Sequence, residues 1–495
     1  MKNSAKQVKI GLYSAGLRVY WSQFEGLFDR LMGYNKFIEH KLKEYGEVYN
    51  FGIMDNADMS IQAGEYFKEN NVDIIFMHSA TYFTSDSVVP IHKICNAPVV
   101  VLNLQPSPRI DYEHTSTGEW LSQCVNCPVP EVSNAFNRAN IPFYCINGLL
   151  GLDKSPMIAM SDENTANRAE AKKAWKEIEE WRLAAMVKKN LSASRFGFLG
   201  GNYSGMLDMY SDLTMLTAQA GIQVEIIEMC DLNERLNRVV DEDVKRKIQD
   251  IENMFEIAGD SSADTRVRRP TDEQLEWSAR VAAAQQKMVE DYKLDARAYY
   301  YHSADGNAYE ELQSGFIVGH SLLTANHVPC AGEADMKTAL AMKICDLLDV
   351  GGSFAEIVVT DYIDGTILIG HDGPFHIKIS DRKPILRGMG VYHGKRGSGI
   401  SVEAKVKRGP VTTLNVTQTV DGRLKFIVSE AEATDGPIMQ IGNTQTPVRF
   451  NTDPDSYMTK WFDEAPTHHC ALAVGHNASV LKKVGILMDI PTVVL

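Results

Sequence analysis

The chain has 495 residues, which is too long for one hydrophobic core and predicts about three domains of roughly 100–200 residues each. Its 44% hydrophobic and 23% charged residues are ordinary for a soluble globular protein, and no stretch reaches the ~20 apolar residues that span a bilayer. A net charge of -14 without clustered Lys and Arg argues against a nucleic-acid partner. The N-terminal stretch has no secretory pattern, so we expect a cytoplasmic protein that acts on a small molecule.

The first predicted domain, residues 1–180, alternates apolar strands with helix-length intervals. This spacing is typical of βαβ units and a parallel, Rossmann-like sheet. A charged run with helical spacing follows at residues 165–190 and is expected to link two domains. The expected strands are residues 8–13, 47–51, 72–77 and 98–104.

The same pattern restarts in a second predicted domain, residues 181–348. Strands are expected at residues 195–199, 224–228 and 296–301, with a helix at 271–288. The glycines of GGNYSG follow the first of these strands, but their spacing matches neither GxGxxG nor the P-loop. We interpret them as a tight turn rather than a nucleotide site.

From residue 349 to 495 the sequence changes to closely spaced strands separated by glycine-containing turns. This pattern predicts an antiparallel sheet or barrel as a third domain, with a helix and a strand at the C-terminal end. The expected barrel strands are residues 354–360, 366–370, 399–407, 412–420 and 424–431.

The eight scattered cysteines do not form the disulfide framework of a short secreted chain, so we expect reduced thiols. Cys124 and Cys127 form a single CxxC motif, which is found in redox pairs and as half of a zinc site. Because no second CxxC accompanies it, we assign it neither role.

Four residues form a candidate metal set. Glu333 lies where a turn becomes an apolar-periodic helix, and Glu356 lies inside an apolar strand, where an acid is costly to bury unless it is paired or bound to a metal. His371 ends the apolar strand TILIG, and His469 belongs to a His468–His469 doublet that we place before a helix. Two carboxylates and two imidazoles without a thiolate suit Mn²⁺, Co²⁺ or Mg²⁺.

Four motifs around these residues resemble, in the same order, motifs of the L-arabinose and L-fucose isomerase superfamily. GEADMKTAL is similar to GEGDWKTA, GGSFAE to GGTSFMED, ILIGHDGP to a strand that ends in a metal histidine, and THHCALAVGH to AHHTxxSHAL. The resemblance favours Glu356 over Asp361 as the second carboxylate and His469 over His468 as the second histidine, although each neighbour remains an alternative.

The resemblance implies two Rossmann-like domains, a C-terminal β-barrel and a homo-oligomer built from trimers, a trimer or hexamer, with active sites between subunits. It also implies an aldose–ketose isomerase in which the metal polarises the sugar's O1 and O2. Glu333 and Glu356 would then move protons through a cis-enediol intermediate, while His371 and His469 act as neutral ligands.

The sugar is expected to differ from L-arabinose. Leu17 stands where the family has a sugar-binding Gln, and a family His is absent from the stretch LNLQPSPRID. An apolar side chain cannot replace a hydrogen bond to a hydroxyl, and such sites reject other hydroxyl patterns strongly. Candidate contacts to another monosaccharide, including one with an acidic group, are Arg18, Trp21, Gln105 and Arg109.

Two other functions are compatible with the same sequence. One is a metal-dependent sugar epimerase, which needs only a different face of reprotonation. The other is a non-catalytic sugar-binding protein, because two consecutive α/β domains around a cleft also occur in that class. The metal set argues against the second of these.

Overall fold

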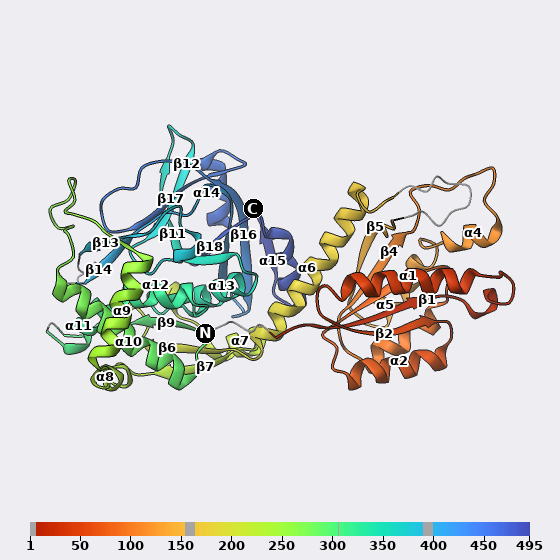
Figure 1. The fold of residues 1–495 in the computed structure, drawn as a ribbon, viewed down its shortest axis with the longest axis horizontal. Helices are drawn as coiled ribbons and strands as arrows, with labels where there is room; N and C mark the ends of the chain where they lie inside the picture. The colour runs from red at the N-terminus through yellow and green to blue at the C-terminus, as the bar shows by residue number, and fades with distance from the viewer. Residues whose placement is uncertain (1–5, 154–163, 305, 390–398) are drawn as a thin grey trace. The chain divides into compact units, whose positions relative to one another are not determined.

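The computed structural model describes residues 6–153, 164–304, 306–389 and 399–495 (Figure 1). The described chain divides into two compact units, Lys6–Lys189 and Asn190–Leu495. No described helix is both long enough and apolar enough to cross a membrane.

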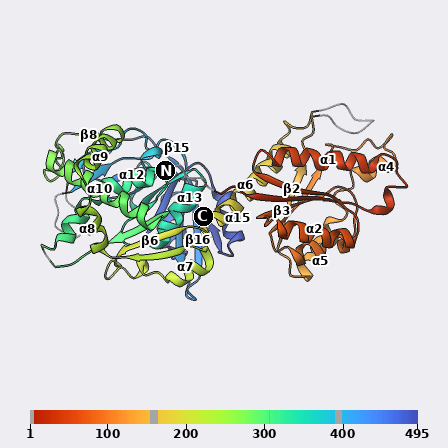
Figure 2. The ribbon, with the colours of Figure 1, turned by 60° about the horizontal axis from the view of Figure 1, so that its bottom comes forward.

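The first unit contains a parallel sheet in the order β2-β1-β3-β4-β5. Figure 2 shows α1 on one face of this sheet and α2 and α5 on the other. Its strands are β1 (Lys9–Ala15), β2 (Glu47–Met54), β3 (Ile74–Ser79), β4 (Val99–Gln105) and β5 (Phe143–Leu149). Its helices are α1 (Leu27–Leu42), α2 (Ala57–Glu69), α3 (Val89–Ile94), α4 (Thr117–Ser122) and α5 (Val129–Arg138), followed by α6 (Ala169–Leu191) at the boundary with the second unit.

The second unit begins with another parallel sheet, in the order β10-β9-β6-β7. Its strands are β6 (Arg195–Gly200), β7 (Gln223–Ile227), β9 (Ala296–Tyr300) and β10 (Cys330–Ala331). The accompanying helices are α7 (Leu213–Ala220), α8 (Met229–Asn237), α9 (Asp241–Met254), α10 (Asp272–Tyr292), α11 (Ala308–Ser314), α12 (Phe316–Ala325) and α13 (Met336–Leu347).

Six antiparallel strands then close into a barrel, because β15 pairs with both β18 and β16 in the order β15-β18-β11-β12-β17-β16. They are β11 (Gly351–Asp361), β12 (Thr366–His371), β15 (Gly409–Gln418), β16 (Leu424–Ala433), β17 (Thr444–Phe450) and β18 (His469–Val474). The remaining elements are α14 (Pro454–Asp463), α15 (Ala478–Leu487) and β19 (Thr492–Val494), which adds to β16 in parallel.

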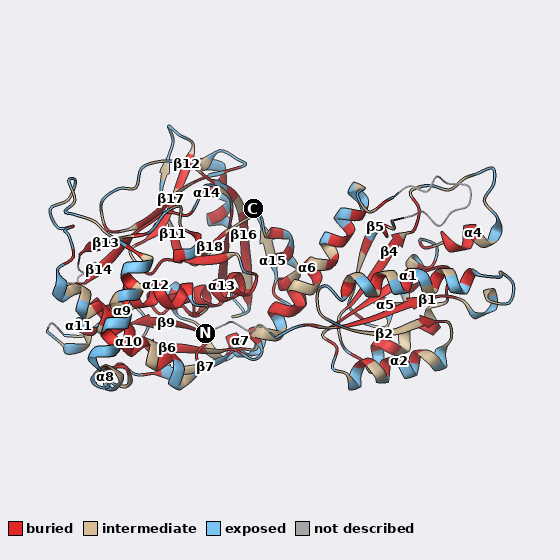
Figure 3. Cartoon of the chain, in the orientation of Figure 1, coloured by how far each residue is buried: buried red, intermediate tan, exposed pale blue. Residues whose placement is uncertain are grey.

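The central sheet and the barrel belong to one core. Helix α13 contacts β9 and β10 of the sheet as well as β11, β15 and β18 of the barrel, and both α12 and α13 are buried along their whole length (Figure 3). A small sheet also joins the two parts, since β8 (Glu256–Ile257) pairs with β13 (Ile385–Gly388), which pairs with β14 (Ile400–Glu403). This shared core holds the carboxyl edge of the sheet against the barrel.

The predicted fold class is confirmed: the chain contains two parallel α/β sheets and a C-terminal antiparallel barrel. The divisions at residues 180 and 348 stay predictions. One local expectation was wrong, because His469 begins strand β18, so a strand and not a helix follows His468. The run of small apolar residues after the doublet extends across the barrel between β11 and β15.

Candidate metal centre

The four predicted metal ligands lie at the junction of the central sheet and the barrel. Glu333 follows β10 in the turn that leads into α13, and its φ of 55° places it in the left-handed region. Glu356 lies in β11, where it is paired with Gly370 of β12 and with His469 of β18. His371 is the residue after Gly370, so strand pairing alone brings the three barrel residues together.

The side chains of three histidines converge on the Glu333 carboxylate. Its oxygens lie 4.0 Å from Nε2 of His371, 3.6 Å from Nε2 of His469 and 3.7 Å from Nε2 of His468. Potential ligand atoms of Glu356, His371 and His469 also lie within 4.8 Å of one another. The two groups share His469, so two carboxylates and three imidazoles form two adjoining clusters.

This donor set fits a divalent cation. Oε2 of Glu333 and Nε2 of His469 are buried, have no hydrogen-bond partner among the described residues, and face each other. Buried polar atoms left unpaired are costly, and a metal ion coordinated by both would satisfy them. Mixed carboxylate and imidazole ligands suit a divalent cation.

A separate carboxylate lies beside Nδ1 of each histidine, and those beside His469 and His468 are in hydrogen-bond geometry. Nδ1 of His469 lies 3.1 Å from Asp335, Nδ1 of His371 lies 3.0 Å from Asp372, and Nδ1 of His468 lies 2.6 Å from Asp208. A proton held on Nδ1 leaves Nε2 with a free lone pair, and this is the arrangement that metal-binding histidines use. In the His469 ring the atom that faces Glu333 is therefore the one able to bind a metal, and in the His468 ring it is able to do so once that ring has lost a proton.

Asp335 has two functions in this arrangement. One carboxylate oxygen caps α13 by accepting hydrogen bonds from the backbone amides of Lys337 and Thr338. The other accepts from the Thr338 hydroxyl and faces His469. Burial would raise the pKa of Asp335, but the His469 hydrogen bond and the Lys337 charge hold it well below its usual range. The start of α13 and the orientation of His469 thus depend on one carboxylate.

The electrostatics distinguish the two adjacent histidines. Burial lowers the pKa of His469, which is 0% exposed, and so favours the neutral form that binds metals. Burial would also lower the pKa of His468, but contacts with Glu333 and Asp208 raise it to about 9. His468 is therefore cationic at neutral pH in the metal-free protein, whereas His469 is neutral.

The alternative carboxylate, Asp361, lies elsewhere. It pairs with Thr366 at the far end of the β11–β12 hairpin, and its side chain accepts hydrogen bonds from the amides of Ile363 and Asp364. These bonds form the hairpin turn. Glu356 is therefore the carboxylate of β11 that the structure brings to the histidines.

The four candidate sugar-contact residues belong to the first unit. Arg18 and Trp21 both bind Asp55, at 2.9 and 2.8 Å, just beyond the carboxyl end of β2. Gln105 ends β4 and donates to the carbonyl of Ser107, while Arg109 is exposed. They lie at or beyond the carboxyl ends of strands, where parallel sheets bind ligands.

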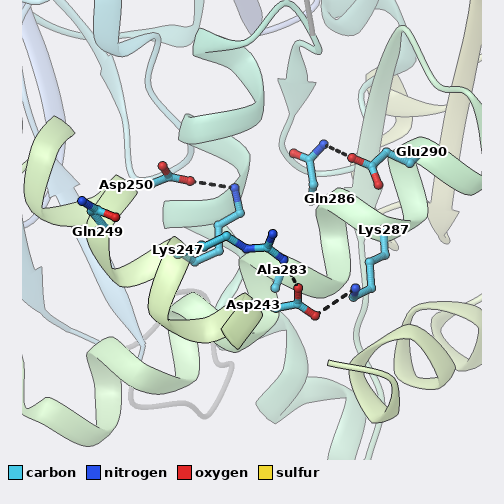
Figure 4. A pocket seen from close by; sticks show the side chains of 9 residues that line it. Asp243, Lys247, Gln249, Asp250, Ala283, Gln286, Lys287 and Glu290 are labelled. Atoms are coloured by element: carbon cyan, nitrogen blue, oxygen red, sulfur yellow. Dashed lines mark hydrogen bonds and ion pairs between the residues drawn. The ribbon is translucent and has the colours of Figure 1, made fainter. Parts of the chain in front are cut away.

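A surface pocket of about 520 Å³ lies between α9 and α10, away from the metal cluster (Figure 4). Its charges pair with one another: Asp243 binds both Arg246 and Lys287, and Lys247 binds Asp250. Because these charges neutralise one another locally, we assign this pocket no ligand.

No protein-family model and no curated protein matches the chain. A solved structure of a periplasmic sugar-binding protein of an ABC sugar transporter from Legionella pneumophila is 12% identical. The alignment covers 67% of this chain and 100% of that chain, with a TM-score of 0.14. A TM-score this low carries no functional argument.

The sequence did not predict the three carboxylates beside the histidines, Asp335, Asp372 and Asp208. Asp335 and Asp372 are each close in sequence to a predicted ligand, so an acid two residues from Glu333 and one beside His371 could have suggested them. Asp208 could not have been found in this way, because 260 residues separate it from His468 and its loop has no distinctive motif.

Proposed function

We propose that this protein is a metal-dependent sugar isomerase that interconverts an aldose and a ketose, with Mn²⁺ as the favoured ion and Co²⁺ or Mg²⁺ as alternatives. The observation that carries the proposal is the buried Glu333 carboxylate faced by Nε2 of His371, His468 and His469. A second carboxylate, Glu356, lies within reach of two of these rings.

Glu333, Glu356, His371 and His469 would hold the ion. When bound, the metal would supply Lewis-acid polarisation of the substrate's O1 and O2, which acidifies the proton on the hydroxyl-bearing carbon. Asp335 and Asp372 would keep the two rings in the orientation that presents Nε2 to the ion.

The two carboxylates would perform the proton transfer. A proton removed from C2 of the aldose must be returned to C1 to give the ketose, by way of a cis-enediol, and a carboxylate can accept and return it. Glu333 is 8% exposed and the His469 beside it is fully buried, so little water would compete at this position. The low exposure supports isomerisation rather than hydrolysis.

The proposed substrate is a monosaccharide other than L-arabinose, because Leu17 and the stretch around Gln105 differ from the family pattern. Because of the same resemblance, we also propose a homo-oligomer built from trimers, either a trimer or a hexamer.

The experiment that tests the proposal is hydrogen exchange in D₂O. The purified protein is incubated with Mn²⁺ and panels of pentoses, hexoses, deoxysugars and sugar acids, and the products are followed by NMR. Deuterium at C2 of an aldose together with a ketose supports the isomerase. Deuterium in an epimeric aldose alone indicates an epimerase, and an absence of exchange with every sugar contradicts both.

A matched pair of variants tests the assigned base. Glu333→Gln should lower the exchange rate by at least about 100-fold, since the amide cannot accept the proton. Glu432→Gln removes an exposed barrel carboxylate that pairs with His476 and should leave the rate unchanged. Substantial exchange by Glu333→Gln would show that another group is the base.

A further inference from the structure

A buried polar cluster lies between the central sheet and its helices, separate from the metal ligands. Arg297 of β9, Gln285 of α10 and His320 of α12 are each 0% exposed. Nε2 of His320 contacts the Arg297 guanidinium and lies 3.1 Å from Nε2 of Gln285. Because both neighbours are donors, His320 Nε2 acts as an acceptor and the ring proton lies on Nδ1.

Three buried donor atoms of this cluster have no hydrogen-bond partner among the described residues. They are Nε and Nη1 of Arg297 and Nδ1 of His320. The Gln285 carbonyl oxygen is also unpaired, and it packs against the backbone of Gly319, where an added Cβ would lie 1.9 Å from it. Unpaired buried donors are rare in folded proteins, and three from two adjacent side chains indicate that an acceptor is missing.

The guanidinium carbon of Arg297 lies 5.9 Å from the centroid of the Phe316 ring, and no described carboxylate balances its charge. Among the described residues no Asp or Glu forms an ion pair with it, and a guanidinium does not lose its proton in a protein. Cys330 and Tyr299 lie nearby, but burial raises the pKa of the Cys330 thiol to about 12 and the pKa of Tyr299 well above its usual value. Both are therefore neutral at pH 7, and a buried cation without a counter-charge is strongly unfavourable.

We propose that Arg297 and His320 bind a small monovalent inorganic anion, of the class of chloride, in the interior of the second unit. One negative charge neutralises Arg297, whereas a divalent anion would leave a buried net charge. The strand neighbours of Arg297 are Gly197 on β6 and Cys330 on β10, and Leu294 and Ile227 fill the space beside Gly197, so the close packing limits the ligand to a compact ion. The anion is structural and independent of the proposed isomerase activity.

The test compares thermal unfolding in chloride with unfolding in gluconate at constant ionic strength and pH. An anion that binds only the folded state raises Tm with its concentration, by about 2 °C for each tenfold increase above its Kd. Arg297→Met should remove this dependence. Arg195→Met is the matched control, since Arg195 is a half-exposed arginine on the adjacent strand β6, and it should retain the dependence.

A second measurement uses only the wild-type protein, so it holds even if Arg297→Met does not fold. Crystals grown in bromide should show an anomalous peak within hydrogen-bond distance of the Arg297 guanidinium. Equal Tm values in chloride and gluconate, or a bromide map without a peak beside Arg297, would overturn the proposal.

Discussion

The adjacent histidines 468 and 469 differ in their surroundings although their rings are in contact, with centroids 3.8 Å apart. His469 is fully buried and contacts Asp335, whereas the His468 side chain is 35% exposed and contacts Asp208. Neutral, buried His469 is suited to bind a cation, and His468 must first lose a proton.

His469→Ala should weaken Mn²⁺ binding by about 100-fold or more, because it removes a ligand, and His468→Ala should weaken it by less than about tenfold. Calorimetric titration of the metal-free variants with Mn²⁺ measures both values. A larger loss of Mn²⁺ affinity in His468→Ala than in His469→Ala would show that His468 is the ligand.

Asp335 allows a sharper test of ring orientation. Asparagine caps helices as well as aspartate does, so Asp335→Asn should preserve the start of α13. Its NH₂ group cannot accept the Nδ1 proton of His469, and we expect Mn²⁺ affinity to fall about 10–100-fold with little change in Tm.

The control for this variant is Asp453→Asn, which changes the capping residue of α14, outside the candidate metal cluster. It should leave Mn²⁺ affinity unaltered. Unchanged affinity in Asp335→Asn would mean that packing alone holds the His469 ring.

At the scale of whole elements, several strands with continuous apolar runs could be predicted from sequence, whereas β5 and β17 were not predicted. Apolar runs at residues 8–13 and 195–199 match β1 and β6, because consecutive buried residues are typical of parallel strands. Strand β17 was missed, since Pro447 and its Thr and Gln residues conceal a barrel strand.

Those residues of the candidate site that stand out from their immediate sequence neighbours could be predicted. Glu356 is conspicuous because an acid inside an apolar strand is unusual, and His371 because it ends such a strand. The strand register decides that Glu356, and not Asp361, reaches the histidines. Tertiary folding decides that Asp208 lies beside His468. These non-local facts are not present in a single sequence.

Gly352, near the start of β11, is packed closely against α13. Gly352 has a φ of 104°, and an added Cβ would lie 2.7 Å from Cβ of Cys345 in the buried helix α13. Gly352→Ala should therefore destabilise the second unit by about 2–5 kcal/mol, through both strain and overlap. It should also reduce Mn²⁺ affinity, since Glu356 lies on the same strand.

Urea unfolding and Mn²⁺ titration measure the two effects. Gly201→Ala is the matched control, because nothing lies within 4 Å of the added carbon and its φ is not in the left-handed region. If Gly352→Ala has the same free energy of unfolding and the same Mn²⁺ affinity as Gly201→Ala, close packing against α13 does not set the position of β11.

At the scale of the molecule, the metal cluster and the candidate sugar contacts belong to different units. All candidate ligands and their orienting carboxylates lie within Asn190–Leu495, whereas Arg18, Trp21, Gln105 and Arg109 lie within Lys6–Lys189. The chain thus separates the groups proposed for chemistry from those proposed for recognition.

This separation predicts that a chain of residues 190–495 binds Mn²⁺ with a Kd within about threefold of the full-length value, since it retains every group of the cluster. Circular dichroism establishes that the fragment is folded, and residues 6–189 serve as the control that should not bind. Retained metal binding with lost deuterium exchange would assign substrate recognition to the first unit. A folded fragment that no longer binds Mn²⁺ would show instead that the cluster requires residues of the first unit.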